Sequence, residues 1–153
     1  ADGLYTSPHL VKLGERVQVE RRALTEAEIV AYARELRPAA ERVAAENPGD
    51  HPSFFEFMTA MAFLQFARKQ CEMSVIEVGL GGRLDATNVV EHPLASVITP
   101  VSLDHIDFLG DNLEAIASEK AGVIKTGTPV FVAAQRRDAL AVIERQAARL
   151  VAP

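Results

Sequence analysis

The pattern of apolar and polar positions along the chain predicts strands that alternate with helices. Residues 16–20 alternate polar and apolar side chains, which is the period of a half-buried strand. Short β-rich segments follow at 73–78, 95–99 and 129–133, and helical patterns lie between and after them at 112–124 and 138–150. Strands alternating with helices favour βαβ units, so we expect an α/β fold with a parallel sheet covered on both faces.

Two capping boxes mark the starts of two further helices. Thr25 and Glu28 have the spacing of one box, and the helix after it is expected to run to about Glu46. Ser53 and Glu56 form the second box. The apolar residues of this second helix cover nearly its whole circumference, which predicts a helix buried between other layers.

Composition narrows the class of protein. The chain has 153 residues, 48% of them hydrophobic and 24% charged, so we expect one folded domain over 1–153. With 16 basic against 21 acidic residues, it lacks the basic excess of a nucleic-acid binder. The single cysteine, Cys71, cannot form a disulfide within the chain, so we expect the reducing cytoplasm. No apolar run approaches the roughly 20 residues that span a membrane. The chain opens on Ala1 without an initiator Met, which suggests a piece of a longer protein.

Unusual polar residues follow the predicted strands. They occur in three segments, at 6–9, 77–88 and 103–110. Ligands of open parallel sheets gather at the carboxyl ends of the strands. These three segments are therefore the candidates for a binding or catalytic site.

One carboxylate, one imidazole and one hydroxyl suggest a metal site. Glu77 belongs to a segment expected to be buried, where an acid is costly unless a cation or a donor pairs with it. His105 follows the next strand along the chain, and Ser7 lies in the opening loop. Their convergence at one sheet edge would favour Mg²⁺ or Mn²⁺. Taken alone, His105 also fits a hydrogen-bonded structural histidine.

The glycines allow two interpretations, and the position of Lys120 favours a structural one. Gly79 and Gly81 begin like a dinucleotide fingerprint, but Leu84 stands at its third glycine, and no Walker A sequence occurs in the chain. A turn at a strand end would use the same glycines. Lys120 fits a solvated cation at the negative end of a helix.

Four motifs in order resemble one family. They are Leu4-Tyr5-Thr6-Ser7-Pro8-His9-Leu10, the run from Glu77 to Asn88 (EVGLGGRLDATN), Leu103-Asp104-His105 and Glu119-Lys120-Ala121-Gly122. The chain resembles the folylpolyglutamate synthase / dihydrofolate synthase family of the Mur ligase superfamily over essentially all its residues. The glycine-rich run is the most specific of the four.

The resemblance implies an ATP-dependent ligase of folate biosynthesis and one-carbon metabolism. Such an enzyme joins L-glutamate to dihydropteroate or a reduced folate through an acyl phosphate, on a three-layer, P-loop ATPase-like central domain. Two alternatives remain at this point. One is a cell-wall Mur ligase acting on a UDP-sugar, and the other is a non-catalytic interaction module on the same scaffold.

The resemblance also implies roles for particular residues. Ser7, Glu77 and His105 would bind Mg²⁺, and Lys120 falls where the family has a carbamylated lysine. The segments that match the family's pterin pocket are Ser53, Phe54, Phe55, Glu56, Leu84, Asp85 and Ala86. Ser53 and Glu56 also fit a helix cap, and the two phenylalanines also fit a hydrophobic core.

The chain departs from the family in two places. The family carries a phosphate-binding loop before the opening motif and a separate glutamate-binding domain after the central one, and neither occurs in these 153 residues. We therefore expect an internal slice of the ATPase domain, inactive by itself. A missing inner strand would leave an apolar sheet edge exposed.

Overall fold

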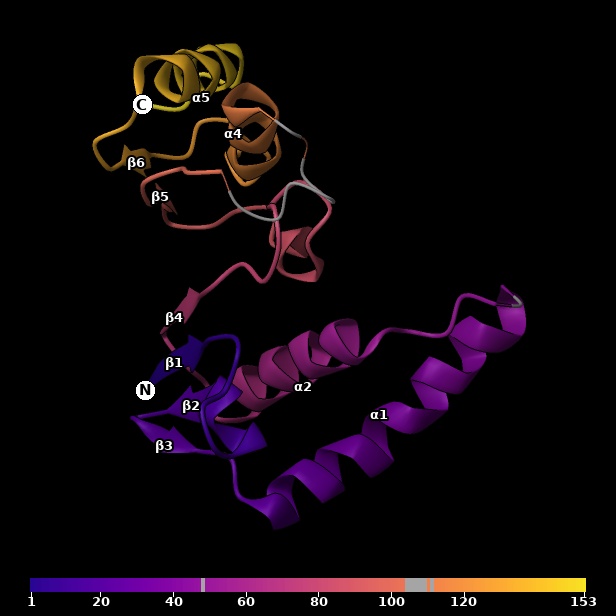
Figure 1. The fold of residues 1–153 in the computed structure, drawn as a ribbon. Coiled ribbons are helices and arrows are strands. Elements are labelled where there is room, and N and C mark those ends of the chain that lie inside the picture. Colours follow the sequence, from indigo (N-terminus) through magenta and orange to yellow (C-terminus); the bar gives the residue numbers. More distant parts are fainter. Residues whose placement is uncertain (48, 104–109, 111) are drawn as a thin grey trace. The chain divides into compact units, whose positions relative to one another are not determined.

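The computed structural model describes residues 1–47, 49–103, 110 and 112–153. They form two compact units, Ala1–Gly79 and Leu80–Pro153. Each unit contains a sheet that includes a parallel pair of strands, with helices packed against it (Figure 1). The α/β class expected from the sequence is confirmed.

The sheet of the first unit is mixed. Its strands are β1 (Asp2–Tyr5), β2 (Val17–Val19), β3 (Arg22–Ala23) and β4 (Met73–Ile76), in the order β3-β2-β1-β4. β1 and β4 are parallel as expected, whereas β2 is antiparallel to both β1 and β3. The expectation of a wholly parallel sheet was wrong for this part. The connection between β2 and β3 is only Glu20 and Arg21, both with positive φ, and so short a link can join only antiparallel strands.

Both helices of the first unit begin at the predicted capping boxes. α1 spans Glu26–Glu46 and α2 spans Phe54–Arg68. In the first box, the Thr25 hydroxyl accepts a 3.2 Å hydrogen bond from the Glu28 N–H, and the Glu28 carboxylate accepts one of 2.8 Å from the Thr25 N–H. Reciprocal bonds of this kind satisfy N–H groups that have no partner inside the helix.

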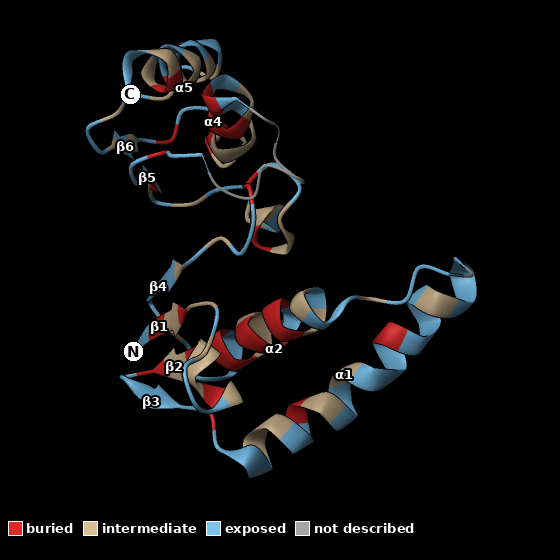
Figure 2. Cartoon of the chain, viewed as in Figure 1, coloured by how far each residue is buried: buried red, intermediate tan, exposed pale blue. Residues whose placement is uncertain are grey.

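Helix α2 lies between the sheet and α1. Met58, Met61 and Phe66 pack with Tyr5 and Val17 of the sheet in the core of this unit. Figure 2 shows buried and exposed residues interspersed along α2. The sheet lies against one side of α2 and α1 lies against another: Tyr32 of α1 belongs to the same core, and its hydroxyl donates a hydrogen bond to Gln65 Oε1. The predicted burial between two layers is therefore confirmed, although residues at the two ends of α2 are exposed.

The second unit pairs two parallel strands. β5 (Ser96–Ile98) and β6 (Val130–Val132) lie side by side, and α4 (Leu113–Ala121) and α5 (Arg137–Arg149) complete the unit with the short 3₁₀ helix η2 (Ala86–Val89). The core contains Ile98, Ile116 and Ile143. These strands and helices lie within three residues of their predicted bounds.

The strands are less covered than the sequence predicts. Val75 of β4, Val97 of β5 and Phe131 of β6 are all exposed by more than 60%. The described residues therefore do not cover both faces of these strands, and the expectation of a buried β4 was wrong. No helix in the described part of the chain has the length and apolar content needed to cross a bilayer.

Candidate functional site

Ser7 and Glu77 meet at the carboxyl ends of two neighbouring strands. β1 and β4 are parallel, and the Glu77 N–H extends their pairing with a 2.9 Å hydrogen bond to the Tyr5 carbonyl. One step further, the Ser7 N–H donates a 2.8 Å hydrogen bond to Glu77 Oε2. The parallel register thus brings Ser7 and Glu77 to one edge of the sheet, and their role as metal ligands stays a prediction.

The donor groups of this pair suit a hard cation. Glu77 is exposed and follows β4, so the premise that it is a buried acid was wrong. Its Oε1 and the Ser7 Oγ make no hydrogen bond or ion pair with the described residues. Carboxylate and hydroxyl oxygens are the ligands that Mg²⁺ prefers. These two residues therefore fit a magnesium site.

The third predicted ligand, His105, belongs to residues 104–109, which lie outside the described residues. Across the described ranges, no three His, Cys, Asp or Glu side chains gather into a metal-binding group. The ligand set of Ser7, Glu77 and His105 stays a prediction.

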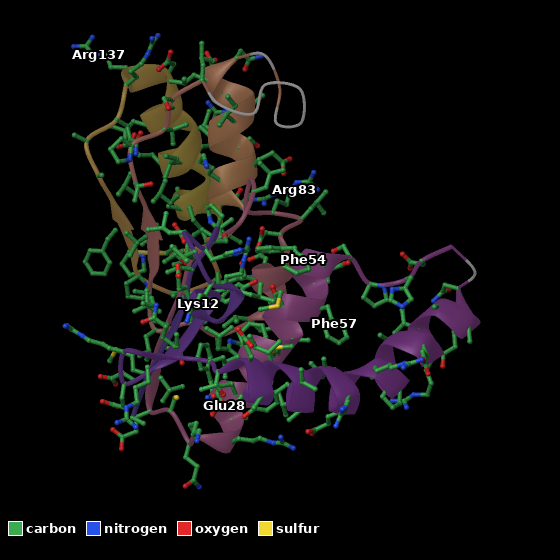
Figure 3. The ribbon with its side chains drawn as sticks, turned by 60° about the horizontal axis from the view of Figure 1, so that its bottom comes forward. Lys12, Glu28, Phe54, Phe57, Arg83 and Arg137 are labelled. Carbon is green, nitrogen blue, oxygen red and sulfur yellow. The ribbon has the colours of Figure 1, made fainter. Side chains whose placement is uncertain are left out.

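Arg16 is a residue of this region that the sequence did not single out. Its Nε donates a 2.9 Å hydrogen bond to His9 Nδ1, and its guanidinium carbon lies 5.4 Å from the centre of the Phe54 ring. A cation over an aromatic face is stabilising. Arg16 therefore connects the opening loop to the start of α2, where Figure 3 labels Phe54. Arg16 directly precedes β2, and the pairing of β2 with β1 brings it beside the opening loop.

Ser53 and Glu56 form the helix cap. The Ser53 N–H donates 2.7 Å to Glu56 Oε2, and the Glu56 N–H donates 3.2 Å to Ser53 Oγ. The Ser53 side chain and backbone together hold the pKa of Glu56 below its usual value. Both residues are exposed, so the cap leaves their remaining lone pairs open to solvent. Their role in a pterin pocket stays a prediction.

The two phenylalanines that follow have different surroundings. Phe54 is 58% exposed, whereas Phe55 is partly buried and its ring centre lies 6.0 Å from that of Tyr5. A Cβ placed on Gly79 would lie 2.4 Å from the Phe55 ring. Phe55 thus occupies the space that Gly79 leaves free. The core interpretation applies to Phe55, and Phe54 is the ring available to a ligand.

Asp85 organises the loop that carries Leu84 and Ala86. Its Oδ2 accepts a 3.0 Å hydrogen bond from the Leu80 N–H, and its Oδ1 accepts one of 2.9 Å from the Thr87 N–H. Leu84 is 78% exposed at the surface of this loop. Asp85 therefore has a structural role, and the predicted contact of these residues with a pterin stays untested.

The glycine-rich loop packs tightly on the end of α4. A Cβ on Gly82 would lie 2.8 Å from the Glu119 carbonyl oxygen, and one on Gly122 would lie 2.5 Å from the Arg83 Cα. The Arg83 guanidinium also pairs with the Glu119 carboxylate at 2.9 Å. These two glycines permit close approach of two backbones, and Gly81 has a φ of 70°, as the turn interpretation predicted.

Lys120 lies in the last turn of α4, within this contact. It is partly buried, and its carbonyl accepts a hydrogen bond from the Val123 N–H. The position matches a cation that stabilises the negative end of a helix. Its neighbours Glu119 and Gly122 are the residues that hold the glycine-rich loop. Lys120 is therefore fixed beside that loop, and its carbamylation stays a prediction.

The fold and the edge site define a class: an α/β domain with a carboxylate and a hydroxyl residue at the carboxyl ends of two parallel strands. The Mur ligase middle domain family matches residues 41–150. The chain belongs to this family.

The chain is similar to enzymes of folate metabolism. It is 42% identical over 152 residues to the dihydrofolate synthase/folylpolyglutamate synthase of Bacillus subtilis, covering 99% of this chain and 35% of that protein. It is 40% identical over 146 residues to the folylpolyglutamate synthase of Lacticaseibacillus casei, covering 95% of this chain and 34% of the relative. The chain thus spans about a third of the length of these relatives.

Solved structures agree with the fold. The apo form of the L. casei enzyme superposes with a TM-score of 0.92 at 38% identity, covering 99% of this chain and 37% of that one. A structure described as a complex of the synthase with AMPPCP and folate gives a TM-score of 0.93 at 39% identity, with the same two coverages. The resemblance read from the four motifs is confirmed.

Proposed function

We propose that the protein to which these residues belong is an ATP-dependent ligase that adds L-glutamate to dihydropteroate or a reduced folate. The 2.8 Å hydrogen bond from the Ser7 N–H to Glu77 Oε2 is the observation that carries this proposal, because it brings a hydroxyl-bearing residue and a carboxylate together at the strand-end edge. The named relatives support it: several are folylpolyglutamate synthases, and one solved relative holds AMPPCP and folate.

The chemistry requires an activated acceptor. The carbon of a carboxylate is a weak electrophile for an amine, and its oxygen is a poor leaving group. Transfer of the ATP γ-phosphate to the carboxylate gives an acyl phosphate and ADP. The glutamate amine then attacks the acyl carbon, loses a proton and releases phosphate.

Ser7 and Glu77 would hold Mg²⁺, with His105 as a further ligand. Such an ion supplies positive charge that offsets the negative charge of the phosphate oxygens during transfer. The Ser7 N–H fixes one oxygen of Glu77 and leaves the other for binding. The side chain therefore needs no large reorientation before a cation arrives.

Exposed residues beside this edge would bind the acceptor. Phe54 offers an aromatic face for a flat ring system, and Arg16 fixes that face from one side. We place the enzyme in the cytoplasm, where the acceptor, glutamate and ATP are all present.

The test is an acceptor-dependent assay of the full natural polypeptide. With ATP, Mg²⁺ and L-glutamate, dihydropteroate or tetrahydrofolate should stimulate ADP release and gain one glutamate. Turnover only with a UDP-sugar acceptor would contradict the folate assignment. Complete lack of Mg²⁺-dependent nucleotide binding would indicate an interaction module. The 153 residues alone should be inactive, because they contain no phosphate-binding loop sequence.

A further inference from the structure

The segment that carries Ser7 is held by polar contacts rather than by burial. Leu10 is 92% exposed and Val11 is 81% exposed, so their side chains gain almost nothing from the hydrophobic core. Lys12, labelled in Figure 3, is also exposed. Hydrogen bonds to its backbone and to the His9 side chain therefore fix this segment.

The carboxylate of Glu15 collects three consecutive backbone N–H groups of the segment. Leu10 donates 2.8 Å to Oε2, Lys12 donates 2.8 Å to Oε1, and Val11 donates 3.2 Å to Oε1. Consecutive N–H groups of this kind form a concave anion site. Hydrogen bonds to a charged acceptor are about twice as strong as neutral ones.

The 3₁₀ helix η1 (Leu13–Arg16), which contains Glu15, holds the segment on both sides of Ser7. Before Ser7, the Thr6 N–H donates 2.9 Å to the Arg16 carbonyl. After it, the Arg16 Nε donates 2.9 Å to His9. Ser7 therefore lies between two attachments to the same short helix.

The short helix is itself fixed to the core. The Leu24 N–H donates 3.2 Å to the Gly14 carbonyl, and a Cβ on Gly14 would lie 1.9 Å from the Leu24 carbonyl oxygen. Leu24 belongs to the hydrophobic core of this unit. Glu15 and its neighbour Arg16 thus connect the opening loop, through the short helix, to the core.

We propose that Glu15 is a positioning residue for the metal site: it fixes the backbone of residues 10–12, shortly after Ser7, so that Ser7 stays against Glu77. The inference rests on the proposed function, since it concerns the same site. Glu15 touches no predicted ligand atom itself. It acts by removing freedom from the segment before the metal binds.

A purely local role is the alternative, in which Glu15 only caps its own 3₁₀ helix. Glu28 provides a matched control because it makes the same kind of capping bonds, at Thr25 before α1, and contacts no residue of the 6–12 segment. Both carboxyl groups also have a pKa held below the usual value, for Glu15 chiefly by the Leu10 and Lys12 N–H groups and for Glu28 chiefly by Thr25.

Glu15→Gln tests the proposal in the full natural polypeptide. Gln has one acceptor oxygen, so its amide NH₂ faces a backbone N–H that Glu15 now satisfies. Two quantities are measured: Mn²⁺ affinity in the presence of a non-hydrolysable ATP analogue, by electron paramagnetic resonance, and hydrogen exchange of amides 6–12.

We expect Glu15→Gln to weaken Mn²⁺ binding by about 10- to 100-fold and to speed exchange across the segment. Glu28→Gln should change neither. Glu15→Asp, which keeps both acceptor oxygens, should restore part of the affinity and guards against loss of folding. Equal Mn²⁺ affinity for Glu15→Gln and Glu28→Gln would overturn the proposal. Failure of the wild-type protein to bind Mn²⁺ would instead refute the proposed function from which it starts.

Discussion

Ser7 and Glu77 lie 70 positions apart in the chain and are joined by a 2.8 Å hydrogen bond from the Ser7 N–H to Glu77 Oε2. The bond continues the parallel pairing of β1 with β4, in which Tyr5 lies opposite Ile76. The fold therefore brings Ser7 and Glu77 together through the pairing of their strands.

Substitutions of Phe54 and Phe55 should have different effects, the first on substrate binding and the second on stability. Phe54→Ala removes an exposed ring, so we expect under about 1 kcal/mol of lost stability but a higher KM for the acceptor. Phe55→Ala removes the ring packed against Tyr5 and should cost about 2 kcal/mol or more. Urea unfolding and steady-state kinetics measure the two effects. A Phe54→Ala enzyme with an unchanged acceptor KM would rule out Phe54 as a contact of the acceptor.

Lys120→Arg distinguishes the two roles of Lys120. Arginine keeps the positive charge at the end of α4, so a helix-end cation would be preserved with little change in stability. Arginine is always protonated and cannot become a carbamate. If carbamylation matters, kcat should fall by about 100-fold or more, as when a charge-stabilising group is removed. Thermal unfolding and kcat are measured together, and an Arg variant with wild-type kcat would leave only the helix-end role.

Gly82→Ala should disturb the loop beside Lys120. The new methyl group would lie 2.8 Å from the Glu119 carbonyl oxygen, which is backbone and has no room to move away. Overpacking of this kind costs about 1–3 kcal/mol. Ser118→Ala, an exposed position on the same helix, serves as the control and should be close to neutral. Equal unfolding midpoints for the two variants would contradict the close packing.

The cap at the start of α1 should make stability depend on pH. The Thr25 N–H lowers the pKa of Glu28 below its ordinary value of 4.5 in the folded protein. A lowered folded pKa means that the stabilisation is complete above pH 4.5 and is lost as the pH falls through the folded pKa. The stability difference between wild type and Glu28→Gln, measured by urea unfolding at several pH values, should be constant near neutrality and shrink below pH 4.5. A difference that grows on acidification would contradict this assignment.

Local chemistry made the helices predictable. The boxes Thr25–Glu28 and Ser53–Glu56 depend only on residues three positions apart, and both helices start where the boxes indicate. Strand burial was harder, because it depends on which layers cover a strand. The β2–β3 hairpin was missed for a different reason: Glu20 and Arg21 adopt positive φ, although neither residue type favours it.

The site was predictable where strand order decides it. Parallel pairing of β1 with β4 explains why Ser7 meets Glu77, whereas the sequence predicted only that these polar residues follow strands and meet at one edge. The roles of Glu15 and Arg16 were not predictable, because they depend on the path of the chain between β1 and β2. The tight contact of Gly82 with Glu119 likewise joins segments that are distant in the sequence.

Metal binding by Glu77→Gln tests the central claim most directly. Gln keeps an oxygen that can accept the Ser7 N–H but removes the charge that binds a cation, so the fold should survive. Glu72→Gln, an exposed position just before β4, is the matched control. In a Mn²⁺ titration of the full natural polypeptide with a non-hydrolysable ATP analogue, Glu77→Gln should lose about 100-fold in affinity while Glu72→Gln binds like wild type. Equal affinity of the two variants would show that Glu77 is not a metal ligand.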